Sequence, residues 1–89
     1  MSERLDSAYE MAQAAIAQLK ASVRVALSEG PKEGLRNVDI GKSLGIYMGH
    51  VEHVGHIPRT LLEIMQKEGV VTQDADTKLW KLNSQVSED

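Results

Sequence analysis

The sequence predicts a small, mainly helical domain that ends in a β-hairpin, and three observations lead to this fold class. Residues 1–29 carry apolar side chains at alternating steps of four and three, which is the spacing of a helix. Two shorter helical segments follow, and each is bounded by glycine or proline stop signals. After Gly69 the apolar period falls from 3.6 residues to 2, which is typical of strands.

The length of 89 residues is that of one domain with one small core. We expect residues 1–82 to form this domain and residues 83–89, which have no pattern and end in two acids, to be a disordered tail. The chain has no cysteine, which excludes disulfides, thiolate zinc sites and a catalytic thiol. The polar first residues and the lack of a long apolar run favour a cytoplasmic protein with no membrane span.

The net charge is −3, with three basic and four acidic residues in 1–29, seven of each in 30–82 and two acids in 83–89. Proteins that bind nucleic acid usually have a clear basic excess, because each neutralised phosphate releases counterions and adds affinity. This chain has no such excess. Nucleic-acid binding would therefore need a local basic patch.

The first helix is predicted to start near Ser2, with acids in its first turn, and to end near Ser28, before Gly30 and Pro31. Its apolar stripe consists of Leu5, Tyr9, Ala12, Ile16, Leu19, Val23 and Ala26. Such a helix is long for so small a domain. The spacing suits two arrangements, a helix that wraps its own domain and the seam of a homodimer, and we expect a homodimer through this first helix.

The next two helices are shorter. The first is predicted to begin at Asn37 as the cap and to stop at Gly45, and the second to begin at Pro58 and to stop at Gly69. A helical wheel divides the second into an apolar side with Ile57, Leu61, Ile64 and Met65 and a polar side with Arg59, Glu63, Gln66 and Lys67. Leu62 falls at the edge of the apolar side.

Two short strands are predicted after this helix, at residues 70–73 and 78–82, joined by a polar turn at residues 74–77. Trp80 is the only tryptophan of the chain. The alternation does not decide whether its ring lies on the inner or the outer face of the hairpin.

The order of these elements and three local motifs resemble a winged helix-turn-helix domain. "VDIGKSLGI" is similar to the second helix of that superfamily, "IPRTLLEIMQKEGVV" to its recognition helix and first wing strand, and "TKLWKL" to the return strand of the wing. The resemblance covers nearly the whole chain and implies a three-helix core plus a wing, with a long N-terminal helix. The sequence departs from the pattern at Tyr47 to His56, because the usual turn takes only three or four residues.

In that superfamily the recognition helix enters the major groove of duplex DNA and the wing touches the backbone. The resemblance therefore implies a sequence-specific DNA-binding protein, a small transcriptional regulator, that reads DNA with the helix 58–68 and touches the backbone with the wing 70–82. The residues carried over by position are Arg59, Thr60, Glu63 and Gln66 on the helix and Lys78 and Lys81 on the wing.

The chemistry of these side chains separates two roles. Arg59 and Gln66 can form bidentate hydrogen bonds with guanine and adenine edges, so they could specify sequence. Lysines would only position the duplex, because a phosphate contact carries no base information. This second set consists of Lys42, Lys67, Lys78 and Lys81.

A different class of function uses the same fold as an adaptor that binds another protein and no DNA. Glu63 can pair with Arg59, and Asp74 and Asp76 put negative charge at the tip of the wing, where a phosphate would be repelled. In this alternative Leu62 and the first helix would make the contacts. The balanced charge favours the adaptor, whereas the arginine, the glutamine and the wing lysines favour DNA.

All three histidines, His50, His53 and His56, lie in the stretch "GHVEHVGHIP". They are candidate zinc ligands, but a zinc site without cysteine needs three converging histidines or carboxylates, and their spacing is not that of a known zinc motif. We expect polar loop histidines and no metal. His56, just before Pro58, could instead donate to a phosphate at the start of the helix.

No arrangement of residues in the sequence predicts catalysis. There is no nucleophile elbow, no glycine-rich phosphate loop and no pair of inward carboxylates. A domain of this size also has little volume for a substrate pocket once its core is filled. We therefore expect no enzyme and no cofactor.

Overall fold

The computed structural model describes residues 3–47 and 55–83. They form three helices, α1 (Glu3–Glu29), α2 (Asn37–Leu44) and α3 (His56–Lys67), followed by the strands β1 (Val71–Gln73) and β2 (Trp80–Leu82). The two strands pair antiparallel, with Thr72 opposite Lys81. The predicted fold class, mainly α with a small β-hairpin, is confirmed.

The hairpin has a further neighbour that the sequence did not indicate. Leu35, between α1 and α2, forms an isolated bridge with Trp80. Its backbone N–H donates to the Trp80 carbonyl at 2.9 Å, and the Trp80 N–H donates to the Leu35 carbonyl at 2.7 Å. This bridge depends on Gly34, which has φ 106° and whose position would place a Cβ only 2.3 Å from the Trp80 carbonyl oxygen.

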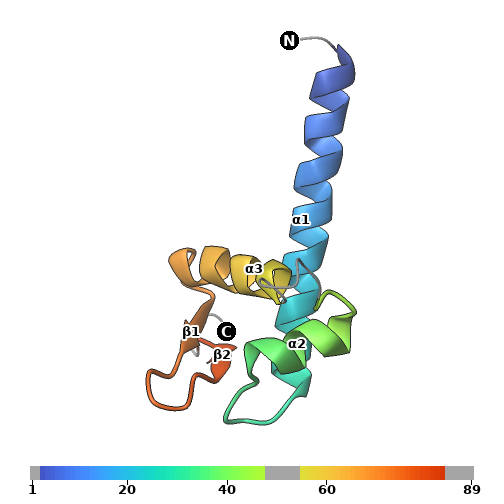
Figure 1. Cartoon of the computed structure of the whole chain (residues 1–89). Coiled ribbons are helices and arrows are strands. Elements are labelled where there is room, and N and C mark those ends of the chain that lie inside the picture. The colour runs from blue at the N-terminus through green and yellow to red at the C-terminus, as the bar shows by residue number, and fades with distance from the viewer. Residues whose placement is uncertain (1–2, 48–54, 84–89) are drawn as a thin grey trace.

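Every element contributes to one core. Its buried apolar side chains are Val23 and Leu27 from α1, Ile40 from α2, Leu61, Leu62 and Met65 from α3, and Val71 and Trp80 from the strands. Trp80 is 5% exposed, so its ring lies on the inner face of the hairpin. The core sits where the lower half of α1 crosses α2, α3 and the hairpin (Figure 1).

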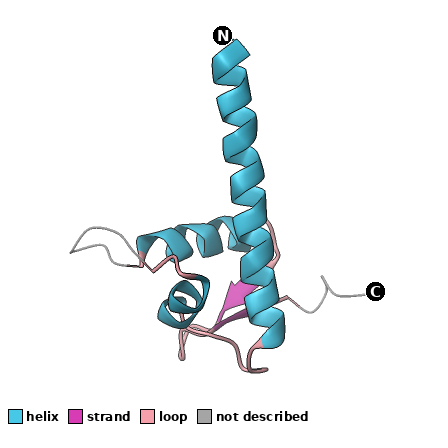
Figure 2. Cartoon of the chain, turned by 90° about the vertical axis from the view of Figure 1, so that its right-hand side faces the viewer, coloured by secondary structure: helices cyan, strands magenta, loops and turns pink. Residues whose placement is uncertain are grey.

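The upper half of α1 takes no part in this core. It rises away from the other elements in both views (Figures 1 and 2), and every residue from 4 to 15 is exposed. The predicted apolar stripe therefore faces the core only from Leu19 onward. An ion pair between Lys20 Nζ and Glu68 Oε2, 2.8 Å apart, links α1 to the end of α3 just below this point.

The predicted helix boundaries need small corrections. α1 ends at Glu29, one residue beyond the predicted end. The N-cap of α2 is Arg36, so Asn37 is the first helical residue and not the cap. α3 begins at His56, two residues before Pro58, because the N–H groups of the first turn have no intrahelical partner and proline is tolerated there.

The predicted apolar side of α3 was wrong at two positions. Leu62, expected at the edge of that side, is fully buried, and Ile64, expected in the core, is 36% exposed. A wheel drawn from α3 alone lacks the position of its neighbours. Because α1, α2 and β1 all contact α3, the buried side is turned toward Pro58 and Leu62.

Candidate nucleic-acid interface

The exposed face of α3 carries all the residues that the sequence predicted for it. His56, Arg59, Thr60, Glu63, Gln66 and Lys67 are exposed, whereas Pro58, Leu61, Leu62 and Met65 are buried on the other side. These exposed positions are three or four residues apart, so they lie on one side of the helix. α3 thus presents one polar face to solvent.

Among residues 3–47 and 55–83, most of the hydrogen-bonding groups on this face have no partner. Within residues 55–83, Arg59 forms no ion pair with Glu63, although one helical turn separates them. His56 Nε2 and Thr60 Oγ1 lie 3.5 Å apart, at the limit of a hydrogen bond. The Arg59 guanidinium is therefore available to a partner.

Three contacts hold the start of α3 in place. The Asn37 side-chain Nδ2 donates to the Gly55 carbonyl at 3.1 Å and so joins α2 to the N-cap of α3. Gly55 has φ 88°, and a Cβ there would lie 2.5 Å from the Tyr47 ring. A Cβ at Gly41 on α2 would lie 2.8 Å from the same ring and 3.0 Å from Pro58. Only glycines at these two positions let α2, Tyr47 and α3 approach so closely.

Asn37 and Tyr47 were not predicted as parts of the site. The sequence predicted Asn37 as the cap of the second helix and no contact with the third. Tyr47 belongs to the stretch Tyr47 to His56, for which the resemblance predicted no structure. The one signal that could have indicated them is the pair Gly41 and Gly55, since glycine often marks a close approach of backbone or ring. Their contribution is to position α3.

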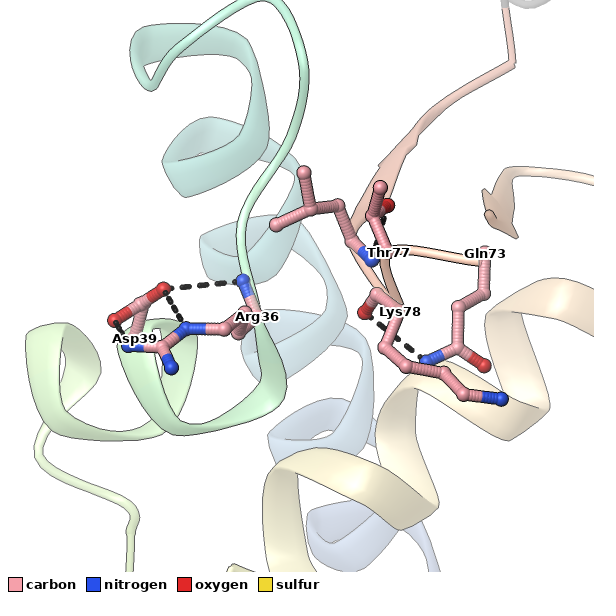
Figure 3. Close-up of polar contacts among 6 residues, drawn as sticks. Arg36, Asp39, Gln73, Thr77 and Lys78 are labelled. Atoms are coloured by element: carbon pink, nitrogen blue, oxygen red, sulfur yellow. Dashed lines mark hydrogen bonds and ion pairs between the residues drawn. The ribbon is translucent and has the colours of Figure 1, made fainter. Parts of the chain in front are cut away.

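The hairpin presents two more of the predicted residues. Lys78 and Lys81 are exposed, and Lys78 has φ 66°, in the left-handed region that lysine rarely adopts. The Lys78 carbonyl accepts a hydrogen bond from the Gln73 side-chain amide at 3.1 Å, as Figure 3 shows. Because of this conformation the second strand starts at Trp80 and not at Lys78 as predicted.

The acids of the hairpin differ in their surroundings. Asp74 Oδ1 accepts the backbone N–H groups of Thr77 at 2.9 Å and Asp76 at 2.8 Å, which closes the turn. The hydrogen bond from the Thr77 N–H, followed by that from Asp76, lowers the pKa of the Asp74 carboxyl. Asp74 is therefore a structural part of the turn as well as a negative charge near its tip.

Two basic side chains, that of Arg36 at the N-cap of α2 and that of Lys42 within α2, have contacts inside the chain. The Arg36 guanidinium donates to both carboxylate oxygens of Asp39, at 3.2 and 3.3 Å, and lowers the pKa of that carboxyl (Figure 3). Lys42 Nζ lies 5.7 Å from the centre of the Tyr47 ring, within range of a cation–π contact. The Lys42 side chain is exposed, so it can still contact a phosphate.

Of the three histidines considered as metal ligands, the structure describes one. His50 and His53 lie outside the described residues, and His56 is exposed at the first position of α3. Among residues 3–47 and 55–83, no three histidine, aspartate or glutamate side chains form a group that could hold a metal ion. Within the same ranges no helix has the length and hydropathy to cross a membrane.

Comparisons of the chain with protein families, with curated proteins and with solved structures found no match.

Proposed function

We propose that the chain is a winged helix-turn-helix domain that binds duplex DNA in a sequence-specific manner and acts as a small transcriptional regulator. In this proposal α3 enters the major groove, and the hairpin from β1 to β2 is the wing that touches the backbone. The bridge of Leu35 to β2 supports the assignment, because it fixes the hairpin beside the helices and not as a loose extension.

The exposed polar face of α3 carries the proposal. Its Arg59 and Gln66 side chains are exposed on a helix whose other side is locked into the core. A helix of this kind fits the major groove, where bidentate contacts distinguish bases. Four exposed lysines can contact phosphates, namely Lys42 on α2, Lys67 on α3 and Lys78 and Lys81 in the hairpin.

The second candidate is an adaptor that uses the same fold to bind protein. The balanced charge and the exposed carboxylates of Glu63, Asp74 and Asp76 favour it. Leu62 cannot be a contact in such a complex, because its side chain is fully buried. An adaptor would have to use α1 and the polar face of α3.

The test is a selection of the pure protein against a pool of random duplex DNA, at low and at physiological salt. Recovery of a preferred sequence supports the proposal. Arg59→Ala should then lower the preference for the selected sequence by about 1–3 kcal/mol, because one bidentate contact is lost. Lys81→Ala should weaken binding to all sequences alike.

Arg4→Ala is the matched control, since it removes an arginine from the far end of α1 and should change neither quantity. Phosphate attraction is strongest at low salt. If no DNA is retained even there, the DNA-binding proposal is overturned and the adaptor remains.

A further inference from the structure

The largest exposed apolar side chains of the described residues gather on α1. Leu5, Tyr9, Met11 and Val25 are 56%, 67%, 73% and 59% exposed, and only Ile64, at 36%, lies elsewhere. Leu5 and Tyr9 continue with Ala12 and the half-buried Ile16 in a single line along the helix. We call these four residues the N-terminal stripe.

A helix of this kind is not expected to stand alone. Isolated helices of about 12–15 residues are marginal in water, and most helical stability in proteins comes from packing an apolar face. The N-terminal half of α1 packs on no other element of the described chain, yet it shows such a face (Figure 2). We therefore expect another apolar surface to pack against this face.

A second copy of the chain matches the stripe when the two helices run antiparallel. If the dyad passes between residues 10 and 11, Leu5 meets Ile16 of the second copy and Tyr9 meets its Ala12. Two aliphatic side chains then pack against each other, and the large tyrosine ring packs against a small alanine. The contact is about 17 Å long at 1.5 Å per residue. An isologous pairing of this kind is the commonest form of association between identical subunits.

The position of the rest of the chain excludes the parallel alternative. The core of each copy lies on the same side of α1 as the stripe, because the buried Val23 and Leu27 continue it. Parallel helices would bring both cores into the space between them. In the antiparallel register Gln18 of one copy is level with Glu3, the first residue of the partner's α1, so each core, which begins at Leu19, lies just beyond that end of the partner helix.

The distribution of charge favours the same orientation. The four charged residues of the exposed half, Glu3, Arg4, Asp6 and Glu10, precede an uncharged run from Met11 to Leu19. Parallel helices would place one acidic end against the other. Antiparallel helices place each acidic end against the uncharged run of the second copy, which avoids the repulsion.

We infer that the N-terminal stripe is the seam of an antiparallel homodimer, with Leu5 against Ile16 and Tyr9 against Ala12 across the dyad. The seam covers three turns of helix, which is small beside the interfaces of permanent dimers, so association depends on concentration in the micromolar range or above. This inference does not depend on DNA binding.

The first experiment compares two glutamate substitutions on α1 by analytical ultracentrifugation over a range of concentrations. Tyr9→Glu puts a charge into the seam and should raise the dimer dissociation constant at least about tenfold. Met11→Glu is the matched control, because Met11 points about 140° away from the centre of the stripe. Both side chains are exposed, so circular dichroism should show an unchanged fold.

The second experiment determines orientation by disulfide trapping, which the absence of native cysteine makes clean. The double variant Ala8→Cys/Ala15→Cys should form a covalent dimer, since residues 8 and 15 flank the seam and face each other only across an antiparallel dyad. Within one chain they are about 10 Å apart, too far for a disulfide. Leu5→Cys alone should be trapped only in a parallel dimer, because the two copies of residue 5 lie about 17 Å apart along the axis of the antiparallel dimer.

The inference is overturned if the wild type does not associate, if Met11→Glu and not Tyr9→Glu dissociates the dimer, or if Leu5→Cys is trapped. None of these results bears on the selection of DNA. The failure of the dimer and the failure of the proposed function are therefore distinguishable.

Discussion

Lys78 is the one non-glycine residue of the described ranges with a positive φ. An L-residue in this conformation costs about 1–2 kcal/mol relative to the right-handed region, a penalty that glycine does not have. The lysine therefore occupies a position that glycine would fit better. We interpret this as a sign that its side chain serves a contact outside the chain.

Lys78→Gly should consequently separate stability from binding. We expect the free energy of unfolding in urea to rise by roughly 0.5–1 kcal/mol, because the backbone strain is relieved. DNA affinity should fall if Lys78 makes the phosphate contact that we propose. Lys78→Ala is the control, since it removes the charge and keeps the strain. A loss of stability in the glycine variant would contradict this interpretation.

At the scale of the element, Leu62 is one of the fully buried side chains that hold α3 in the core. Leu62→Ala should lower the free energy of unfolding by about 2–5 kcal/mol, because it leaves a cavity in the core. Ile64→Ala should cost less than about 1 kcal/mol, since that side chain is partly in solvent. Chemical denaturation of both variants shows which one loses more stability. A larger loss for Ile64→Ala than for Leu62→Ala would mean that Ile64 lies in the core, as the helical wheel predicted.

The hairpin should lose stability in acid through Asp74. Its pKa is lowered in the folded chain, so its contribution is fully present above the unfolded value of about 3.9 and is lost as the pH falls through the folded value. Trp80 fluorescence during denaturation, measured from about pH 6 downward, should therefore show weakening below about pH 4.

Asp74→Asn is the control for this profile, because its side-chain carbonyl can still accept the two N–H groups but does not titrate. Asp39 also has a lowered pKa and stays in both proteins. The difference between the two profiles thus isolates Asp74. Identical profiles would mean that the turn does not depend on its charge.

The elements differ in how far the sequence predicted them. The order of helices and strands followed from glycine stops and from the change of period after Gly69, which are local signals. The bridge of Leu35 to Trp80 could not be predicted, because a single strand residue has no period. The burial of Leu62 could not be predicted either, since it depends on three neighbouring elements.

In the candidate site, too, the sequence predicted the features that depend on local signals and missed those that depend on tertiary contacts. The exposed side of α3 was predicted correctly because a polar side is visible in the sequence of one helix. The conformation of Lys78 and the contact of Asn37 with Gly55 are set by tertiary geometry. Neither residue type indicates them, so the predicted roles of these two residues were incomplete or wrong.

For the whole molecule, the proposed dimer and the proposed DNA interface should both affect the salt dependence of DNA binding. If Lys42, Lys67, Lys78 and Lys81 each neutralise one phosphate, the slope of log affinity against log salt should be about −4 for one bound copy and about twice that for a dimer. Tyr9→Glu should reduce the slope of the dimer to that of one copy. Equal slopes for the two proteins would mean that only one copy contacts DNA.

The ion pair of Lys20 with Glu68 lies close to the point where α1 leaves the core and its N-terminal half begins to project. Lys20 lies about 25 Å below the first turn of α1, so a bend of about 10° in the helix just above this ion pair would tilt the projecting part and move its tip by about 4 Å, while Val23 and Leu27 stay in the core. In a dimer joined at the tips, the same small tilt would change the separation of the two α3 helices. The distance between the two DNA half-sites would then be adjustable without any change in the cores.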